Sequence, residues 1–223
     1  MRGIGTLRER LVVPRRTAVL ADTLSRGLFD AQTALDVGCG EGSIDLLIQA
    51  AMPGLMIRGV DVLVWPEARI PVETFDGYQL PFDDKSFDTV MFVDVLHHTD
   101  DPMVLLREAK RVARRAIVLK DHTADGALAD LILRFMDWVG NAHHNVTLPY
   151  NYWSEQRWRA AFAELGLAIE QWQSTLGLYP WPASLVFERG LHFVARLGPQ
   201  NIQPLFQLPG DAKDARLGAS HYV

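Results

Sequence analysis

Three glycines, Gly38, Gly40 and Gly42, stand at alternate positions in the segment TALDVGCGEGS, directly after a short apolar run. Glycine tolerates a positive φ and leaves bare backbone for a ligand to touch, and a helix that follows adds free N–H groups and a partial positive charge. A dinucleotide site would hold a pyrophosphate here, normally with G-x-G-x-x-G spacing. The spacing is instead G-x-G-x-G, and Asp36 and Glu41 would repel a pyrophosphate. The loop therefore favours a ligand with an ammonium group, a carboxylate and a sulfonium.

Acids follow other apolar runs, and each has a structural as well as a ligand-binding interpretation. Asp61 ends the run GVD, where an acid can accept two hydrogen bonds from a cis-diol; a capping acid is the alternative. Asp76 could contact the same ligand or form an Asx turn before Gly77. Asp36 could also bind nearby backbone N–H groups. Cys39 is expected to be a small buried residue beside the loop and not a nucleophile.

The elements that must position these residues alternate between strand and helix patterns. Runs rich in Val, Ile and Phe predict strands at 33–37, 56–62, 72–75, 87–96, 116–120, 168–172 and 191–197. Apolar residues at helical spacing predict helices at 15–29, 43–52, 101–113, about 127–138 and 154–166. Asp101 and Ser154 are expected as N-caps. This alternation predicts an α/β fold with a doubly wound sheet, whose ligand lies at the carboxyl ends of the strands.

The length of 223 residues suits one large domain. We expect a single domain over 1–197, with an N-terminal helix and a cap insertion at about 123–153. Residues 198–223 contain Pro, Gly and Asp and few large apolar groups, so we expect a mobile tail there, with a lid as the alternative.

Four motifs, in order and with sensible spacing, make residues 30–120 similar to the class I S-adenosylmethionine-dependent methyltransferases, and within them to the small-molecule "type 11" group. LDVGCGEGS resembles the first motif. VDV at 60–62 resembles the second strand end, whose acid binds the ribose hydroxyls. FDGYQLPFDDKSFD at 75–88 is similar to the adenine-binding stretch, and VDVLHHTDDP at 93–102 to the motif that lines the methionine portion.

The resemblance implies S-adenosylmethionine as cofactor and a Rossmann-like, mostly parallel seven-stranded sheet with helices on both faces and an antiparallel last strand. The cofactor-binding residues that it implies are Asp36, Gly38, Cys39, Gly40, Gly42, Asp61, Val62, Asp76, Gly77, Tyr78, Asp94, Val95 and His97. One departure follows Asp61. The segment VLVWPEARIPV at 62–72 has two prolines and no room for the family's full helix, so a loop should stand beside the adenine, with Trp65 either covering the ring or simply packing.

Methyl transfer is an in-line displacement at a sulfonium, so the protein mainly positions the acceptor and excludes water. A base is needed only if the acceptor must lose a proton. The candidate catalytic residues follow the fourth and fifth strands and are His98, Asp121 and His122. His97 and His98 are neighbours, so at most one should face the ligand. His122 could be the base, or Asp121 and His122 could form a structural hydrogen bond.

The insertion after the fifth strand resembles segments that form the acceptor pocket in related enzymes. The candidate substrate residues are Trp138, Asn141, His144, Tyr150 and Tyr152. Aromatic side chains with scattered amides suit a small, flat or apolar acceptor; the alternative is that they anchor the cap. His143 and His144 could form a metal site with His122, but no matched carboxylate pattern accompanies them, so no metal is predicted.

Composition narrows the class of protein. The formal net charge of −5 argues against charge-driven binding to nucleic acid or anionic membrane, and the basic run RVARR at 111–115 is interpreted as the solvated end of a helix. One cysteine, no signal-peptide pattern and no long apolar stretch favour a soluble, cytoplasmic monomer or homodimer acting on a small molecule. The alternatives are a non-catalytic cofactor-binding regulatory module and, less favoured by the glycine spacing, a nicotinamide-dependent oxidoreductase.

Overall fold

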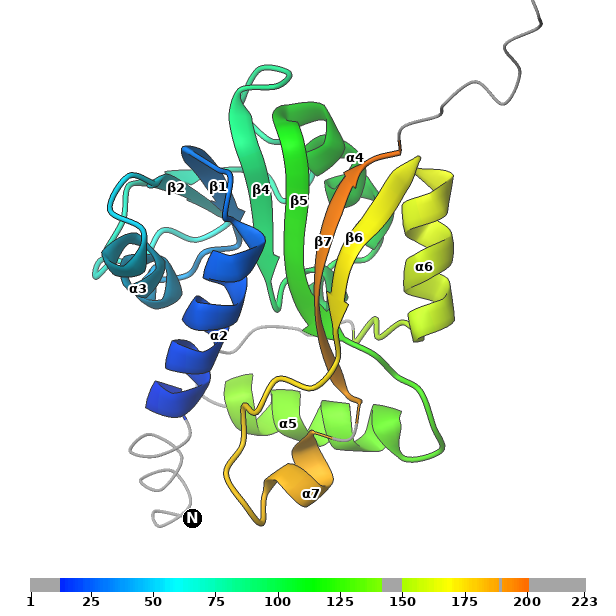
Figure 1. Ribbon diagram of the computed structural model, residues 1–223. Helices are drawn as coiled ribbons and strands as arrows, with labels where there is room; N and C mark the ends of the chain where they lie inside the picture. Colours follow the sequence, from blue (N-terminus) through cyan, green and yellow to red (C-terminus); the bar gives the residue numbers. More distant parts are fainter. Residues whose placement is uncertain (1–12, 142–149, 189, 201–223) are drawn as a thin grey trace, which may run out of the picture.

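The computed structural model describes residues 13–141, 150–188 and 190–200, without the side chains of 137–141. Its seven-stranded sheet has the order β3-β2-β1-β4-β5-β7-β6 (Figure 1). The strands are β1 (Thr33–Val37), β2 (Met56–Asp61), β3 (Val72–Thr74), β4 (Phe87–Val93), β5 (Ala113–His122), β6 (Leu167–Gln173) and β7 (His192–Pro199). The strands β1 to β5 pair in parallel, and β7 lies antiparallel between β5 and β6. The predicted α/β fold, with its mostly parallel sheet and antiparallel last strand, is confirmed.

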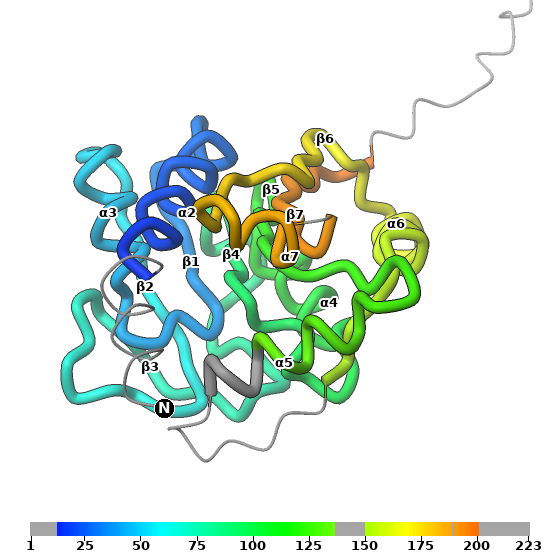
Figure 2. The backbone as a smooth tube through the Cα atoms, turned by 90° about the horizontal axis from the view of Figure 1, so that it is seen from below, coloured from blue at the N-terminus to red at the C-terminus, as the bar shows by residue number. Residues whose placement is uncertain are grey.

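Helices cover both faces of the sheet and its lower end. They are α2 (Val13–Gly27), α3 (Ser43–Ala51), α4 (Pro102–Val112), α5 (Ala129–Asn141), α6 (Glu155–Glu164) and α7 (Ser184–Phe187), with a 3-10 turn η2 (Leu96–His98). The helices α2 and α3 pack on one face, and α4 and α6 on the other (Figure 1). The short cap elements α5 and α7 lie below the sheet, and the view from that end shows them nearest the reader (Figure 2). In the part of the chain that the structure describes, no helix is long and apolar enough to span a membrane.

Strand alternation divides the core into two clusters. In β1, Leu35 and Val37 join the cluster under α4 and α6, whereas Ala34 joins the one under α2 and α3. Asp36 follows the same alternation as Ala34, and its side chain therefore points toward α3. The predicted caps are also present: Asp101 accepts a hydrogen bond from Met103 N, and Ser154 from Arg157 N.

Several predicted boundaries are wrong. The fourth strand ends at Val93 instead of 96, because Asp94 has a φ of 59° and η2 follows. The fifth strand begins at Ala113, so the second half of RVARR is strand and not the end of a helix. The seventh strand runs from His192 to Pro199 instead of 191–197, and residues 201–223 of the predicted tail lie outside the described residues.

The two edges of the sheet carry charged side chains. The edge strand β3 has three residues, and its Glu73 pairs with Arg58 of β2. At the other edge, the pairing of β6 with β7 shifts register between Ile169 and Gln171, and Glu170 at this bulge pairs with Arg196 of β7. No helix separates β2 from β3, as the prolines of the connecting loop predict.

Candidate active site at the carboxyl ends of the strands

The loop between β1 and α3 needs its glycines. Gly38, Gly40 and Gly42 have φ values of 74°, 57° and 79°, which side-chain-bearing residues rarely adopt. A Cβ atom on Gly38 would lie 2.6 Å from Val95 Cγ2, and one on Gly42 would lie 2.8 Å from Ile70 Cγ1. The glycines therefore allow both the left-handed turn and the close approach of neighbouring loops.

Asp61, at the end of β2, braces this loop. Its Oδ2 accepts a hydrogen bond from Gly40 N at 2.9 Å, and its Oδ1 accepts one from Leu63 N at 3.1 Å. The capping alternative is therefore present in the structure. A carboxylate oxygen can accept more than one hydrogen bond, so this arrangement remains compatible with the predicted contact to ribose hydroxyls. Val62 follows and is exposed.

Asp76 forms an Asx turn, which was one of the two interpretations that the sequence allowed. Its Oδ1 accepts hydrogen bonds from Tyr78 N and Gln79 N, both at 2.8 Å. The hydrogen bond from Gln79, followed by that from Tyr78, lowers the pKa of the exposed Asp76 carboxyl. Gly77 lies against Val62, since a Cβ on it would be 3.4 Å from Val62 Cγ1. The structure thus brings this stretch next to the end of β2, and its contact with a cofactor stays a prediction.

Two buried carboxyl groups meet under the glycine loop, and the sequence pointed to only one of them. Asp36 on β1 is 3% exposed and Asp45 in α3 is 1% exposed, and their side chains lie against each other. Burial, followed by the charge of Asp45, holds the pKa of Asp36 well above its ordinary value, and burial raises the pKa of Asp45 to about 6. Burial, together with Asp36, also raises the pKa of the Cys39 thiol, which fits the expectation that Cys39 is not a nucleophile. An acid inside the apolar helix pattern SIDLLIQAAM was the signal for Asp45.

Asp121 is the centre of a second buried group, at the ends of β4 and β5. Its Oδ1 lies 2.7 Å from His97 Nδ1 and accepts a hydrogen bond from His122 N at 2.8 Å, and its Oδ2 accepts one from Leu96 N at 3.1 Å. Burial acts to raise the pKa of Asp121, but His97 and the hydrogen bond from His122 outweigh it and hold that pKa well below its ordinary value. Asp121 is therefore an ionised carboxylate, and it orients the two segments that carry His97 and His122.

The imidazole of His122 lies between two carboxylates. Its Nδ1 is 3.5 Å from Asp121 Oδ1 and 3.6 Å from Asp94 Oδ1. The ring centroid lies 4.6 Å from that of His97 and 4.9 Å from that of His192. Burial, followed by the positive charge of Lys120, holds the pKa of His122 well below its ordinary value. His122 is therefore neutral near pH 7 and able to accept a proton.

Sequence reasoning missed three residues of this cluster. The fully buried Lys120 and the half-exposed Arg16 of α2 both bond the Asp94 carboxylate. Burial acts to raise the pKa of Asp94, but the charges of Lys120 and Arg16 hold it well below its ordinary value. His192 enters from β7, directly opposite His122 in the β5–β7 register. A lysine inside the apolar run AIVLK was a readable signal, whereas Arg16 and His192 come from distant elements.

Among the predicted cofactor-binding and substrate residues, two have rings that contact the ring of His122. They are His97 and Tyr152. The ring of Tyr152 stacks on His97, with centroids 5.4 Å apart, and lies edge-on to His122 at 5.9 Å. His98 contacts the His97 ring at 4.0 Å, and the described contacts place His97 rather than His98 beside Asp121. Tyr150 lies 6.3 Å from Tyr152, ring to ring. Predicted residues that fall outside the described side chains are Trp138, Asn141, His143 and His144.

Asn151, which was not predicted, fastens the cap to η2. Its backbone N–H donates to His97 O at 3.1 Å, and its side-chain amide donates to Thr99 O at 3.2 Å. Trp153 is buried against Trp158, with ring centroids 4.7 Å apart, so this aromatic anchors the cap. The cap thus holds Tyr152 over the histidines.

Asp94, His97 and His122 could each offer one ligand atom within 4.8 Å of the others, as at a metal site. The Asp94 carboxylate is, however, already bonded by Lys120 and Arg16. A divalent cation would meet these two positive charges at the same carboxylate. The arrangement is better described as an acid–base network than as a metal centre.

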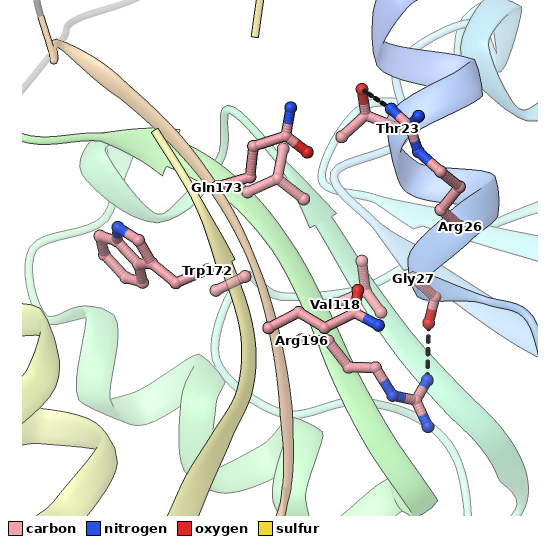
Figure 3. Close-up of a pocket in the computed structure, with 10 residues that line it drawn as sticks. Thr23, Arg26, Gly27, Val118, Trp172, Gln173 and Arg196 are labelled. Carbon is pink, nitrogen blue, oxygen red and sulfur yellow. Dashed lines mark hydrogen bonds between the residues drawn. The ribbon is translucent and has the colours of Figure 1, made fainter. Parts of the chain in front are cut away.

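A separate cavity of about 550 Å³ lies on the sheet face between α2 and the strands β6 and β7 (Figure 3). Arg196 borders it and donates to Gly27 O at 2.6 Å, while its other nitrogens bond Glu170 and Asp30. Arg26 at the opposite wall donates to Thr23 Oγ1 at 3.3 Å. The charged groups of this cavity are therefore engaged in structural contacts, and its lining shares no residue with the predicted site.

Comparisons with known proteins show which family the chain resembles. A family model described as a methyltransferase domain matches residues 9–171. The chain is 30% identical over 122 residues to 27-O-demethylrifamycin SV methyltransferase of Amycolatopsis mediterranei, which covers 48% of this chain and 44% of that one. It is 32% identical over 91 residues to demethylmenaquinone methyltransferase of Thermotoga maritima, covering 38% and 40%. The chain thus spans less than half the length of the curated relatives it matches.

A solved structure of geranyl diphosphate methyltransferase in complex with S-adenosylmethionine superposes with a TM-score of 0.61 over 81% of this chain and 84% of that chain. The sequence identity is 14%, so this likeness shows a shared fold.

Proposed function

The chain belongs to the methyltransferase-domain family, and from this premise we propose that the protein transfers the methyl group of S-adenosylmethionine to a small-molecule acceptor. This membership agrees with the resemblance found in the sequence. It also agrees with the class I methyltransferase fold and with S-adenosylmethionine as the cofactor. The observation that carries the proposal is the left-handed glycine loop between β1 and α3, braced by Asp61. Three of the five positions of this loop carry no side chain, so a ligand can approach the backbone closely at the place where the methionine portion would lie.

We assign the two ends of the cofactor to two parts of the site. Asp61 would bind the ribose hydroxyls, and the neighbouring stretch around Gly77 and Tyr78 would face the adenine. The loop from Gly38 to Gly42, with Val95 packed against Gly38, would hold the methionine portion. This assignment is supported by the contacts that bring the ends of β1, β2 and β4 together.

We assign His122 as the group that accepts the acceptor's proton. When bound, S-adenosylmethionine would supply the methyl group: an electron pair of the acceptor oxygen, nitrogen or carbon would form the new bond to the methyl carbon, and the electrons of the broken S–CH₃ bond would stay on sulfur to give S-adenosylhomocysteine. The acceptor's proton passes to the neutral His122 and later to water. The imidazolium so formed would lie between the carboxylates of Asp121 and Asp94, which stabilise its charge.

The two curated relatives named above are methyltransferases of 27-O-demethylrifamycin SV and of demethylmenaquinone, which supports a small organic acceptor. Tyr152, which is partly exposed and stacks on the buried His97 beside His122, offers a flat aromatic face to such a molecule. The net charge of −5 supports action without nucleic acid or anionic membrane, and the single cysteine fits a reducing compartment such as the cytoplasm.

Calorimetric titration with S-adenosylmethionine, S-adenosylhomocysteine and NAD tests the cofactor. Saturable binding of the first two without NAD is expected, and binding of NAD alone would reject the proposal. Transfer of a labelled methyl group from S-adenosylmethionine to a panel of small hydroxyl, amine and carbon acceptors then tests catalysis. Cofactor binding without transfer to any acceptor in the panel would instead favour a regulatory binding module.

A further inference from the structure

The surroundings of Asp36 and Asp45 favour the presence of a proton on this buried pair. Both side chains are almost completely buried, and they lie against each other. Two ionised carboxylates in contact and out of water would repel each other strongly. Each residue also keeps one buried oxygen, Oδ1, without a hydrogen-bond partner. The pair is therefore poised between a protonated and an ionised form.

The groups packed around the pair favour the protonated form. Asp61 approaches from β2 and Cys39 from the loop, and Asp61 adds a further negative charge. From α2, which packs on α3, the buried residues are uncharged: Leu20, Ala21, Thr23, Leu24 and Gly27. A positive charge brought close to the loop would reverse this balance, because it stabilises the ionised carboxylate.

The glycine loop connects the two members of the pair. Asp36 precedes it on β1, and Asp45 follows it in the first turn of α3. In the proposed function, the cofactor's methionine portion lies against this loop. S-adenosylmethionine brings a sulfonium cation there, whereas S-adenosylhomocysteine has a neutral thioether. The two cofactor forms thus differ by one positive charge beside a buried group that can lose a proton.

We propose that Asp36 and Asp45 form a proton-exchanging carboxyl pair that lets the protein bind the cationic S-adenosylmethionine in preference to the neutral S-adenosylhomocysteine. Binding of the sulfonium releases a proton from the pair to solvent. Once the methyl group has left, the positive charge is gone, the pair takes a proton back from solvent, and the product is held less tightly. This inference rests on the proposed function.

Calorimetry in buffers of different ionisation enthalpy measures the protons released per ligand. Titrations between pH 5.5 and 7.0 stay below the range in which an α-amino group ordinarily titrates, so the pair is observed without the ligand's own ionisation. We expect proton release, up to about one per S-adenosylmethionine, and a Kd that tightens about three- to tenfold per pH unit. S-adenosylhomocysteine should release none and should bind with a Kd that is flat over this range.

Asp45→Asn keeps the shape but removes one of the two carboxyl groups and the negative charge that acts on Asp36. It should lower the proton release and reduce the preference for S-adenosylmethionine over S-adenosylhomocysteine at pH 7.0 by at least about threefold. Asp36→Asn should act in the same direction. Asp22→Asn removes an exposed acid from α2, the helix that packs on α3, and should release as many protons as the wild type.

Equal proton release for both ligands, or undiminished release in both Asp45→Asn and Asp36→Asn, would overturn the inference. Because the wild type must bind S-adenosylmethionine for either result to be recorded, such an outcome would leave the proposed function intact. Absence of binding by the folded wild type would reject both.

Discussion

Asp121 Oδ1 lies 2.7 Å from His97 Nδ1, and neither side chain is more than 1% exposed. This contact joins the end of β5 to the turn that follows β4, at the edge of the sheet where parallel strands present their carboxyl ends. The same carboxylate accepts hydrogen bonds from Leu96 N and His122 N, so one buried group fixes both chain segments. The position of His122 thus depends on Asp121.

Replacing Asp121 should therefore destabilise the fold. Asp121→Asn would present an amide N–H₂ to groups that now meet an acceptor, and we expect a loss of about 2–4 kcal/mol in the free energy of unfolding. Urea unfolding followed by far-UV circular dichroism measures it. Asp100→Asn, at an exposed position in the turn before α4, should change stability by less than about 0.5 kcal/mol. Equal stability of the two variants would contradict the structural role of Asp121.

His122→Gln tests the proposed base. Removing a positioned proton acceptor typically lowers the rate by about 10²–10⁴-fold. The reduction should appear in kcat, while the Kd for S-adenosylmethionine should stay within about threefold of the wild type, because His122 is assigned to the acceptor and not to the cofactor. Single-turnover methyl transfer and calorimetry on the same preparation separate the two. Normal turnover with any acceptor that must lose a proton would remove His122 from this role.

The low pKa of His122 predicts that kcat begins to fall only at an unusually low pH, which is the acid limb of its pH profile. The base must be neutral to act, and burial together with Lys120 holds its pKa below 6.5, so kcat should stay level from pH 8 down to about pH 6.5. Lys120→Met removes one cause of this lowering, and the acid limb should move toward higher pH. The measurement is kcat against pH for both proteins. An unmoved limb in a folded Lys120→Met protein would show that another group titrates.

Asp45→Asn should change how stability depends on pH. The folded-state pKa of Asp45 is raised from 3.8 to about 6, so its contribution to stability is fully present below pH 3.8 and is lost as the pH rises toward 6. The variant lacks this loss, so its stability relative to the wild type should improve on going from pH 4 to pH 7, by on the order of 1–3 kcal/mol. Urea unfolding at both pH values measures the difference. A constant difference would mean that Asp45 titrates normally.

Asp61→Ala should weaken both cofactor forms alike, by more than about tenfold, since both carry the same ribose. The loss of the brace to Gly40 N acts in the same direction. Calorimetric Kd values for S-adenosylmethionine and S-adenosylhomocysteine give the test. This equal effect contrasts with Asp45→Asn, for which only the preference between the two ligands should change. Undiminished binding would exclude Asp61 as the ribose acid.

The sequence was sufficient for features whose cause is local. A left-handed glycine loop between a strand and a helix, an N-cap at Asp101 and a helix-free connection with two prolines all follow from short stretches of chain. Contacts across the fold were not predictable in this way. His192 reaches His122 only because β7 inserts antiparallel beside β5, and Arg16 reaches Asp94 from a helix 78 positions earlier in the chain.

The early end of β4 has the same explanation. Its apolar run continues to Leu96, but Asp94 turns to a φ of 59° so that its carboxylate can bond Lys120 and Arg16. The partners that stabilise this turn lie on two other elements. A prediction from strand propensity alone therefore placed the end of β4 too late in the chain.

The charged edges of the sheet bear on how copies of the chain can meet. A strand with open N–H and C=O groups invites another chain to pair with it, and short strands, bulges and charged side chains oppose such pairing. Here β3 is short and carries Glu73, and β6 is interrupted at Glu170. Two copies would therefore not fuse their sheets into a continuous one, and edge-to-edge aggregation through β3 or β6 is disfavoured. Any homodimer would have to form through helices or loops.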